Sequence, residues 1–216
     1  MAITTYDSLV AEVKAWTARS DSTFSNRFPS FVQMVEDRIY NGSGNPGDPL
    51  YSPPLRTRAM ETTAEITITD GVGTLPADPV DLRGLTRAGD DTGLTYAEPA
   101  SFKTMDVNAG AGFPYYYTVE GNTLRVSPSW TGTLTASFTK RLAAITQENQ
   151  TGELIGLHGL LYFNACMFEA YSFMQEPDLA LAWLAKYRSM LDGLNRVASS
   201  TRTTATRTRI RARAIG

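Results

Sequence analysis

The sequence predicts an α+β fold in which a four-helix bundle has an inserted antiparallel β-sheet or small β-sandwich and ends in an extended C-terminal arm. Hydrophobic residues recur with a helical period at both ends of the 216-residue chain and with a period of two in its middle. From Ser199 onward neither period continues. Strands that are grouped between helices and joined by short links favour an inserted antiparallel sheet over a doubly wound parallel one.

The N-terminal segment predicts two amphipathic helices. Thr4 or Thr5 can cap the first helix, and a polar break at residues 19–23 separates it from the second. Pro29 suits the first position of a helix, so we expect the second helix to begin near it. The predicted buried faces comprise Tyr6, Leu9, Val10, Val13 and Trp16 in the first helix and Phe28, Phe31, Val32, Val35 and Ile39 in the second.

The middle of the chain has the pattern of short strands. Residues 41–54 are rich in glycine and proline and are predicted to form a loop. Between Met60 and Thr69 every second residue faces one side of a strand, and Ile66 and Ile68 indicate that this side is buried. Further strands are expected at residues 72–75, 81–86, 115–120, 123–127 and 133–140, with a short helix or loop at 97–107.

Two more helices are predicted after the strands. Residues 160–174 are apolar on nearly every side, as is typical of a helix buried among other helices. After a stop at residues 175–178, a second helix that packs back on the first is indicated by apolar residues at steps of three and four: Leu181, Trp183, Leu184, Tyr187, Leu191, Leu194 and Val197. The predicted parts are N-terminal bundle helices with a loop (1–55), a β insertion (56–145), a C-terminal helix pair (146–198) and a basic tail (199–216).

The composition is that of a folded protein made in a reducing compartment. With 42% hydrophobic and 10% aromatic residues, the chain can bury a core of its own. The N-terminus lacks the basic start and apolar run of a signal peptide, so we expect synthesis in the cytosol. The single cysteine, Cys166, can form no internal disulfide. His158, Asn164 and Glu169 interrupt residues 155–174, which argues against a membrane span there.

Charge is divided unevenly along the chain. The sequence has 20 basic and 22 acidic residues, and five of the arginines follow Ser199, where there is no acid. The rest of the chain therefore has 15 basic and 22 acidic residues, a net charge near −7, whereas the tail has a net charge near +5. Such a block at a terminus predicts an interaction arm for an acidic or phosphate-bearing partner.

No pattern in the sequence predicts catalysis or a bound cofactor. His158 has no nucleophile and orienting acid at a recognisable spacing, and Cys166 lies about two helical turns further on. We expect both residues to be structural. Residues 42–47 match GxGxxG, but they follow a helix and contain Pro46, whereas the dinucleotide-binding motif follows a strand and opens a helix. We therefore expect no enzyme activity, no cofactor and no metal site.

The arginine-rich tail is the strongest functional signal in the sequence. Its composition is compatible with a disordered solubilising end, with phosphate contacts to nucleic acid, or with docking on an acidic protein surface. Ile210 and Ile215 favour a protein partner, because apolar side chains add nothing to contacts with phosphates alone.

Six segments, spread over nearly the whole body of the chain, have the pattern of a known protein family. They are YDSLVAEVKAWTARSD, RFPSFVQMVEDRIY, PLRTRAMETTAEITI, TLPADPVDLRGL, YYYTVEGNTLRVSP and LYFNACMFEAYSFMQEPDLALAWLAKYRSMLDGL. In these segments the chain resembles the head-to-tail adaptor (connector, or head completion) proteins of short-tailed and related tailed bacteriophages.

The resemblance implies a structural virion protein at the head–tail interface. Family members are helical bundles with a β insertion that form a ring, usually of twelve copies, beneath the portal protein. The ring extends the channel for packaged DNA and gives the tail nozzle or tube protein its platform. The expected location is the neck of the virion, with assembly in the host cytoplasm and no membrane. By analogy with adaptor arms that reach the portal, the expected portal-binding residues are Arg202, Arg207, Arg209, Ile210, Arg211, Arg213 and Ile215. The alternative is a nucleic-acid-binding module that uses the same tail.

Overall fold

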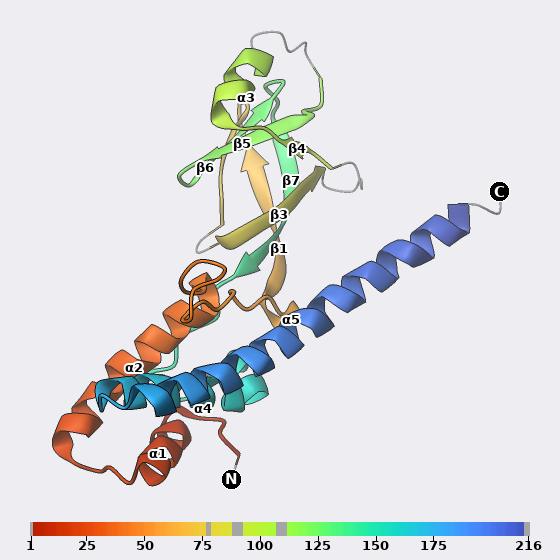
Figure 1. The fold of residues 1–216 in the computed structure, drawn as a ribbon. Helices are drawn as coiled ribbons and strands as arrows, with labels where there is room; N and C mark the ends of the chain where they lie inside the picture. Colours follow the sequence, from red (N-terminus) through yellow and green to blue (C-terminus); the bar gives the residue numbers. More distant parts are fainter. Residues whose placement is uncertain (1, 77–78, 88–92, 107–111, 214–216) are drawn as a thin grey trace. The chain divides into compact units, whose positions relative to one another are not determined.

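The computed structural model describes the backbone of residues 2–76, 79–87, 93–106 and 112–213, with side chains in these ranges up to Ser199 except those of Pro79 and Asp106. The described residues form five α-helices and two β-sheets, which confirms the predicted α+β class (Figure 1). The chain divides into two compact units. Residues 1–59 and 142–216 form a helical unit, and residues 60–141 form a unit built mainly of strands.

Helix α1 spans Tyr6–Thr17, and its N-terminus is capped as predicted. The Thr5 hydroxyl accepts a hydrogen bond from the Ser8 amide at 3.1 Å, which satisfies a backbone donor that has no partner within the helix. The side chains of Tyr6, Leu9 and Val13 are buried, in agreement with the predicted stripe. Trp16 is the exception, because 59% of its surface remains exposed.

Helix α2 spans Ser22–Asn41, so the prediction that it begins near Pro29 is wrong. Its cap is Asp21, whose carboxylate accepts a hydrogen bond from the Phe24 amide at 3.0 Å. Pro29 lies inside the helix, where it removes one backbone donor. Phe24 and Phe28 are fully buried in the turns before Pro29, and burial of two aromatic rings outweighs the lost hydrogen bond.

Helix α4 spans Glu153–Phe173 and is the central element of the helical unit. It packs against α1, against α2 and against α5, which spans Pro177–Arg213. The backbone of α4 leaves helical geometry at His158, with φ −133° and ψ 43°. Burial on almost all sides of the following residues agrees with the prediction for 160–174.

The C-terminal arm is helical in the structure, so the predicted extended conformation is wrong for residues 199–213. These residues follow an established helix and therefore avoid the cost of nucleating a new one. Arginine and alanine have high helix propensity, and no glycine or proline occurs between Gly193 and Gly216 to stop the helix.

The strand unit contains two sheets. One has the order β1 (Glu61–Ile68), β7 (Gly132–Lys140), β3 (Pro79–Arg87), and both of its pairings are antiparallel. The other has the order β2 (Val72–Thr74), β6 (Thr123–Ser127), β5 (Tyr116–Glu120), β4 (Thr95–Tyr96). The predicted strands are present, and the added strand β4 pairs with β5 in parallel, which departs from the all-antiparallel prediction. Helix α3 spans Pro99–Asp106 and contacts β5 and β6.

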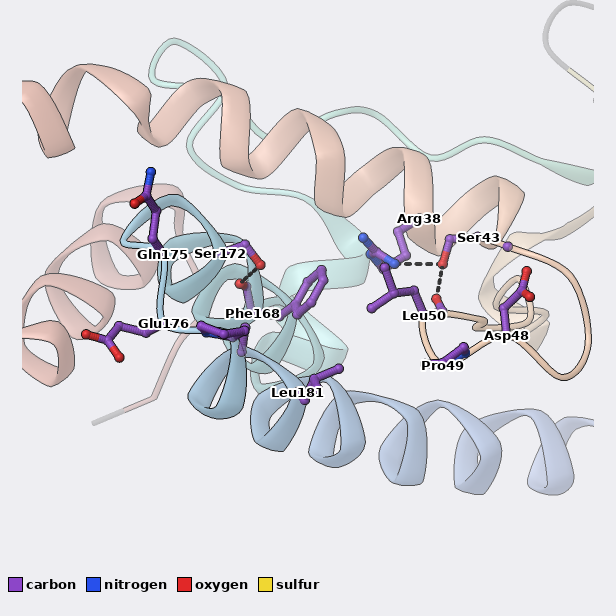
Figure 2. A pocket seen from close by; sticks show the side chains of 13 residues that line it. Arg38, Ser43, Asp48, Pro49, Leu50, Phe168, Ser172, Gln175, Glu176 and Leu181 are labelled. Atoms are coloured by element: carbon purple, nitrogen blue, oxygen red, sulfur yellow. Dashed lines mark hydrogen bonds between the residues drawn. The ribbon is translucent and has the colours of Figure 1, made fainter.

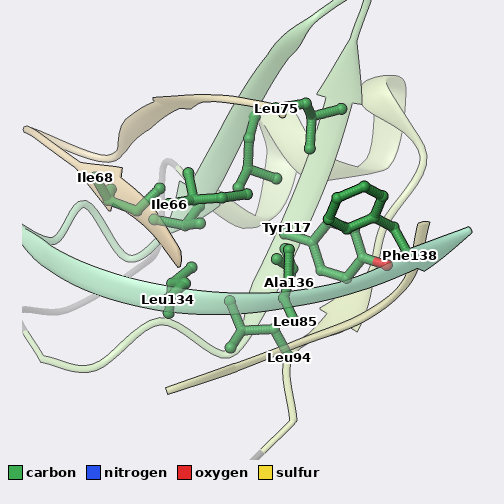
Figure 3. Packing of buried hydrophobic residues seen from close by; sticks show 11 residues of the cluster. Ile66, Ile68, Leu75, Leu85, Leu94, Tyr117, Leu134, Ala136 and Phe138 are labelled. Atoms are coloured by element: carbon green, nitrogen blue, oxygen red, sulfur yellow. The ribbon is translucent and has the colours of Figure 1, made fainter. Parts of the chain in front are cut away.

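The two sheets share one hydrophobic core. Ile66, Leu134 and Ala136 come from the first sheet, and Tyr117 comes from the second (Figure 3). Leu124 of the second sheet belongs to the same core. On β1 the buried residues Ile66 and Ile68 alternate with exposed polar ones, as the period-two pattern predicts. The strand unit therefore has a core of its own.

Candidate interaction site

The predicted partner-binding residues lie at the end of α5. Arg202, Arg207, Arg209, Ile210, Arg211 and Arg213 belong to its helical backbone, their side chains lie outside the described residues, and Ile215 lies outside them altogether. With 37 residues, α5 is about 55 Å long at 1.5 Å per residue. The basic tail (199–216, called the basic segment below) is therefore, as far as Arg213, the last part of one long helix that begins in the helical core.

The beginning of α5 forms one wall of a groove in the helical unit. The groove has a volume of about 900 Å³ and is lined by Arg38, Ser43, Gly44, Asp48, Pro49, Leu50, Phe168, Ser172, Gln175, Glu176, Pro177, Ala180 and Leu181. Figure 2 shows Phe168 and Leu181 in the middle of this surface, with Glu176 and Asp48 toward opposite ends. Leu50 and Leu181 remain 49% and 45% exposed, so the groove offers apolar surface to a partner.

The inner wall of the groove contains a buried ion pair. Arg38 of α2 donates from Nη2 to Glu169 Oε1 of α4 at 2.9 Å, and from Nη1 to the Ser43 hydroxyl at 2.6 Å. The guanidinium also lies 4.7 Å from the centre of the Phe168 ring. Burial raises the pKa of Glu169 above its ordinary value, although the Arg38 charge acts in the opposite direction. Arg38 is therefore held in place by three neighbours and adds no free charge to the groove.

The loop after α2 forms the opposite wall and is fixed at both ends. Ser43 and Ser52 pair through two backbone hydrogen bonds of 2.9 Å, and Arg188 of α5 donates to the Pro49 carbonyl at 2.7 Å. Gly42 has φ +72°, and a Cβ there would lie 2.7 Å from the Ser52 carbonyl oxygen. The glycines that match a nucleotide-binding pattern thus form a tight loop that follows α2, as expected from their position in the sequence.

Burial determines the charge states of His158 and Cys166. Burial lowers the pKa of His158 and raises that of Cys166, which keeps the imidazole neutral and the thiol protonated near neutral pH. The Cys166 side chain is fully buried in α4. Among the described residues, no group of three or more histidine, cysteine or acidic side chains is placed to hold a metal ion. Within the same residues, no helix is long and apolar enough to span a membrane.

Sequence reasoning missed the groove. Arg38 and Glu169 are separated by 131 positions, and no local pattern indicates that they meet. The available signal was the isolated Glu169 in an otherwise apolar helix, because a buried carboxylate requires a cationic partner. Leu181 and Val197 were predicted to be on the buried face of α5 but are exposed, whereas Trp183, Leu184, Tyr187 and Leu191 are buried as predicted.

Comparison with known proteins identifies the family of the chain. A search of curated proteins found no match. The family model described as SU10 adaptor protein matches residues 4–211, which includes the two units and most of the basic segment. A match of this extent covers nearly the whole chain, and the chain therefore belongs to the SU10 adaptor family, a family of phage head–tail adaptor proteins.

Proposed function

We propose that this chain is a structural protein of a phage virion that forms a ring beneath the portal, extends the DNA channel and provides the attachment platform for the tail. The observation that supports this most strongly is the family match over residues 4–211. In this proposal α1, α2, α4 and α5 act as the four-helix bundle of the ring subunit, the strand unit is its insertion, and the role requires no catalysis. The ring contains twelve copies and lies at the head–tail interface.

The basic segment is the proposed contact with the portal. Residues 199–216 have a net charge near +5 against a body near −7, so the segment suits an acidic surface on another protein. Arg202, Arg207, Arg209, Arg211 and Arg213 serve as charge contacts, and Ile210 and Ile215 serve as apolar anchors. In a ring many copies engage at once, so contacts that are weak singly add up to stable docking.

Deletion of residues 199–216 tests the portal contact. The deleted protein should keep its helical and strand cores, because both lie within earlier residues, yet it should fail to join DNA-filled heads. Normal incorporation of the deleted protein would contradict the proposal. A matched control replaces the five arginines with lysine, which keeps the charge but removes bidentate pairing with carboxylates.

The ring itself is tested by the mass of the protein in solution, alone and mixed with the portal complex of the same virus. The expected result is a monomer that becomes a multi-copy ring on the portal. A nucleic-acid-binding module is the second candidate, because five arginines without an acid also suit phosphates. It predicts that the isolated protein ignores the portal and binds duplex DNA with an affinity that falls steeply with salt.

A further inference from the structure

The groove beside α5 has the chemistry of a site for a basic segment with an apolar anchor. Its middle is formed by Phe168, Leu181 and Leu50, and its two remaining charged residues are Asp48 and Glu176. Neither carboxylate forms an ion pair with another described residue, whereas Arg38 is already paired with Glu169. A ligand that buries an aliphatic side chain and brings cations to both ends of the groove would satisfy all of these groups.

Residues 199–216 of this same chain have that composition. Ile210 lies between Arg209 and Arg211, with Arg207 and Arg213 two residues further out and no acid in the segment. Helical segments that dock in grooves use the same arrangement of an apolar anchor flanked by charges that match the rim. The segment and the groove are therefore complementary in charge and in apolar character.

The segment cannot reach the groove of its own copy. Ala180, which lines the groove, and Ile210 belong to one continuous helix, and 30 residues at 1.5 Å each separate them by about 45 Å. Any contact between the two must therefore join two molecules. This excludes an intramolecular lock and leaves a second copy as the source of the segment.

We propose that the groove lined by Asp48, Leu50, Phe168, Glu176 and Leu181 binds residues 199–216 of a second copy of this chain. The contact is heterologous, because a groove on one copy receives a helix end from another, so it can extend from copy to copy. It goes beyond the proposed portal docking. A single contact of this kind is weak, so the isolated protein stays monomeric until the portal gathers many copies. Both contacts use the same segment, so one copy of the segment makes one of them at a time.

The test measures binding of a fluorescently labelled peptide of residues 199–216 to the full-length protein by anisotropy. Saturable binding to the wild type is expected, and Leu181→Gln should weaken it about tenfold, because the Ile210 anchor would then face a polar amide instead of apolar surface. Leu179→Gln is the matched control. Leu179 lies two residues earlier on α5, is similarly exposed at 47% and does not line the groove, so the substitution should leave binding unchanged.

Two further variants test the chemistry of the contact. Glu176→Lys should weaken binding while Glu148→Lys, at an exposed position that does not line the groove, should not. A peptide with Ile210→Asp should lose binding to the wild-type protein. Absence of saturable binding, or equal weakening by Leu181→Gln and Leu179→Gln, would overturn the proposal. Leu181→Gln should still dock on the portal complex, because the proposed portal contact uses the tail and not the groove. If the wild-type protein binds the peptide but does not dock on the portal complex, the portal role alone is contradicted.

Discussion

The Arg38–Glu169 pair joins α2 to α4 at a place where neither side chain has much contact with water. The side chains are 14% and 9% exposed, so both charges lose most of their hydration on folding. The attraction between the two charges offsets this loss. The surface pair Arg19–Asp21 has a similar distance of 2.8 Å, but its side chains are 39% and 43% exposed, and solvent screens the attraction. The two ion pairs therefore differ in their burial and not in their distance.

Arg38→Met should lower the free energy of unfolding by about 3 kcal/mol at neutral pH, because it leaves the Glu169 charge buried without a partner. Methionine keeps an unbranched apolar chain against Phe168, so the loss reports mainly on the charge. Urea unfolding followed by circular dichroism measures it. Arg19→Met, at the exposed pair, is the control and should leave the urea midpoint nearly unchanged. A loss at Arg38 no larger than that at Arg19 would show that the buried pair is unimportant.

The cost of Arg38→Met should also depend on pH. The pKa of Glu169 is already raised by burial, and removal of the Arg38 charge raises it further. A raised pKa means that the folded state binds the proton more tightly than the unfolded state. The contribution of Glu169 to stability therefore falls as the pH rises from the ordinary glutamate pKa to the folded value. Urea unfolding at pH 5 should show a smaller loss than at pH 7.5, and an equal loss would contradict this account.

At the scale of elements, the beginning of α4 is shaped by an approach that only glycine permits. The Ile3 carbonyl oxygen lies so close to Gly159 that a Cβ on this residue would overlap it. The N-terminal segment thus crosses α4 directly on its backbone, and the non-helical His158 immediately precedes the crossing. The Tyr6 amide then donates to the Gln150 carbonyl at 2.8 Å, which fixes the start of α1 beside the segment that leads into α4.

Gly159→Ala should destabilise the helical unit by about 1–3 kcal/mol, because the added methyl group must displace the chain at Ile3. Gly193→Ala is the opposite case: a Cβ there meets no atom within 4 Å, so the substitution in α5 should stabilise by up to about 1 kcal/mol through helix propensity. Thermal unfolding followed by circular dichroism compares the two. A stabilising Gly159→Ala would show that Ile3 does not lie on α4.

At the scale of the whole molecule, the chain has two cores that exclude water separately. The strand core includes Leu134, which is completely buried, and the helical core is centred on α4. The two cores come from compact units, and the chain passes between them twice, near residues 59 and 142. Separate cores give each unit its own source of stability.

Leu134→Ala should destabilise the strand unit by about 2–5 kcal/mol, because it leaves a cavity in that core. Trp130 reports on the strand unit, while Trp16 and Trp183 report on the helical unit. Urea unfolding is therefore followed by tryptophan fluorescence in two versions of the protein. In the first, Trp130 is the one tryptophan left, and in the second, Trp130→Phe leaves Trp16 and Trp183. The urea midpoint reported by Trp130 should fall more than the midpoint reported by Trp16 and Trp183. An equal fall in both would mean that the two units unfold as one.

Local patterns in the sequence were enough to predict most of the helices and strands of this protein and the class of its fold. The alternation in β1, the apolar α4 and the cap at Thr5 depend on neighbours within a few positions, so local periods and capping residues predicted them correctly. Six segments of the chain that resemble adaptor proteins predicted the family, and the match of the family model confirms that the chain belongs to it. The position of α2 and the conformation of residues 199–213 were predicted wrongly. In both cases the outcome depends on burial or on an adjoining helix rather than on local residues.

The contacts between residues far apart in the sequence became known from the folded structure. The sheet orders, the parallel pairing of β4 with β5, the Arg38–Glu169 pair and the groove between the loop and α5 each join positions that are far apart in the sequence. No periodicity encodes such contacts, because they follow from the packing of complete elements against one another. The uneven division of charge between body and tail is visible in the sequence. The groove with acidic residues at its ends, which matches the basic tail, forms only when the helical unit folds.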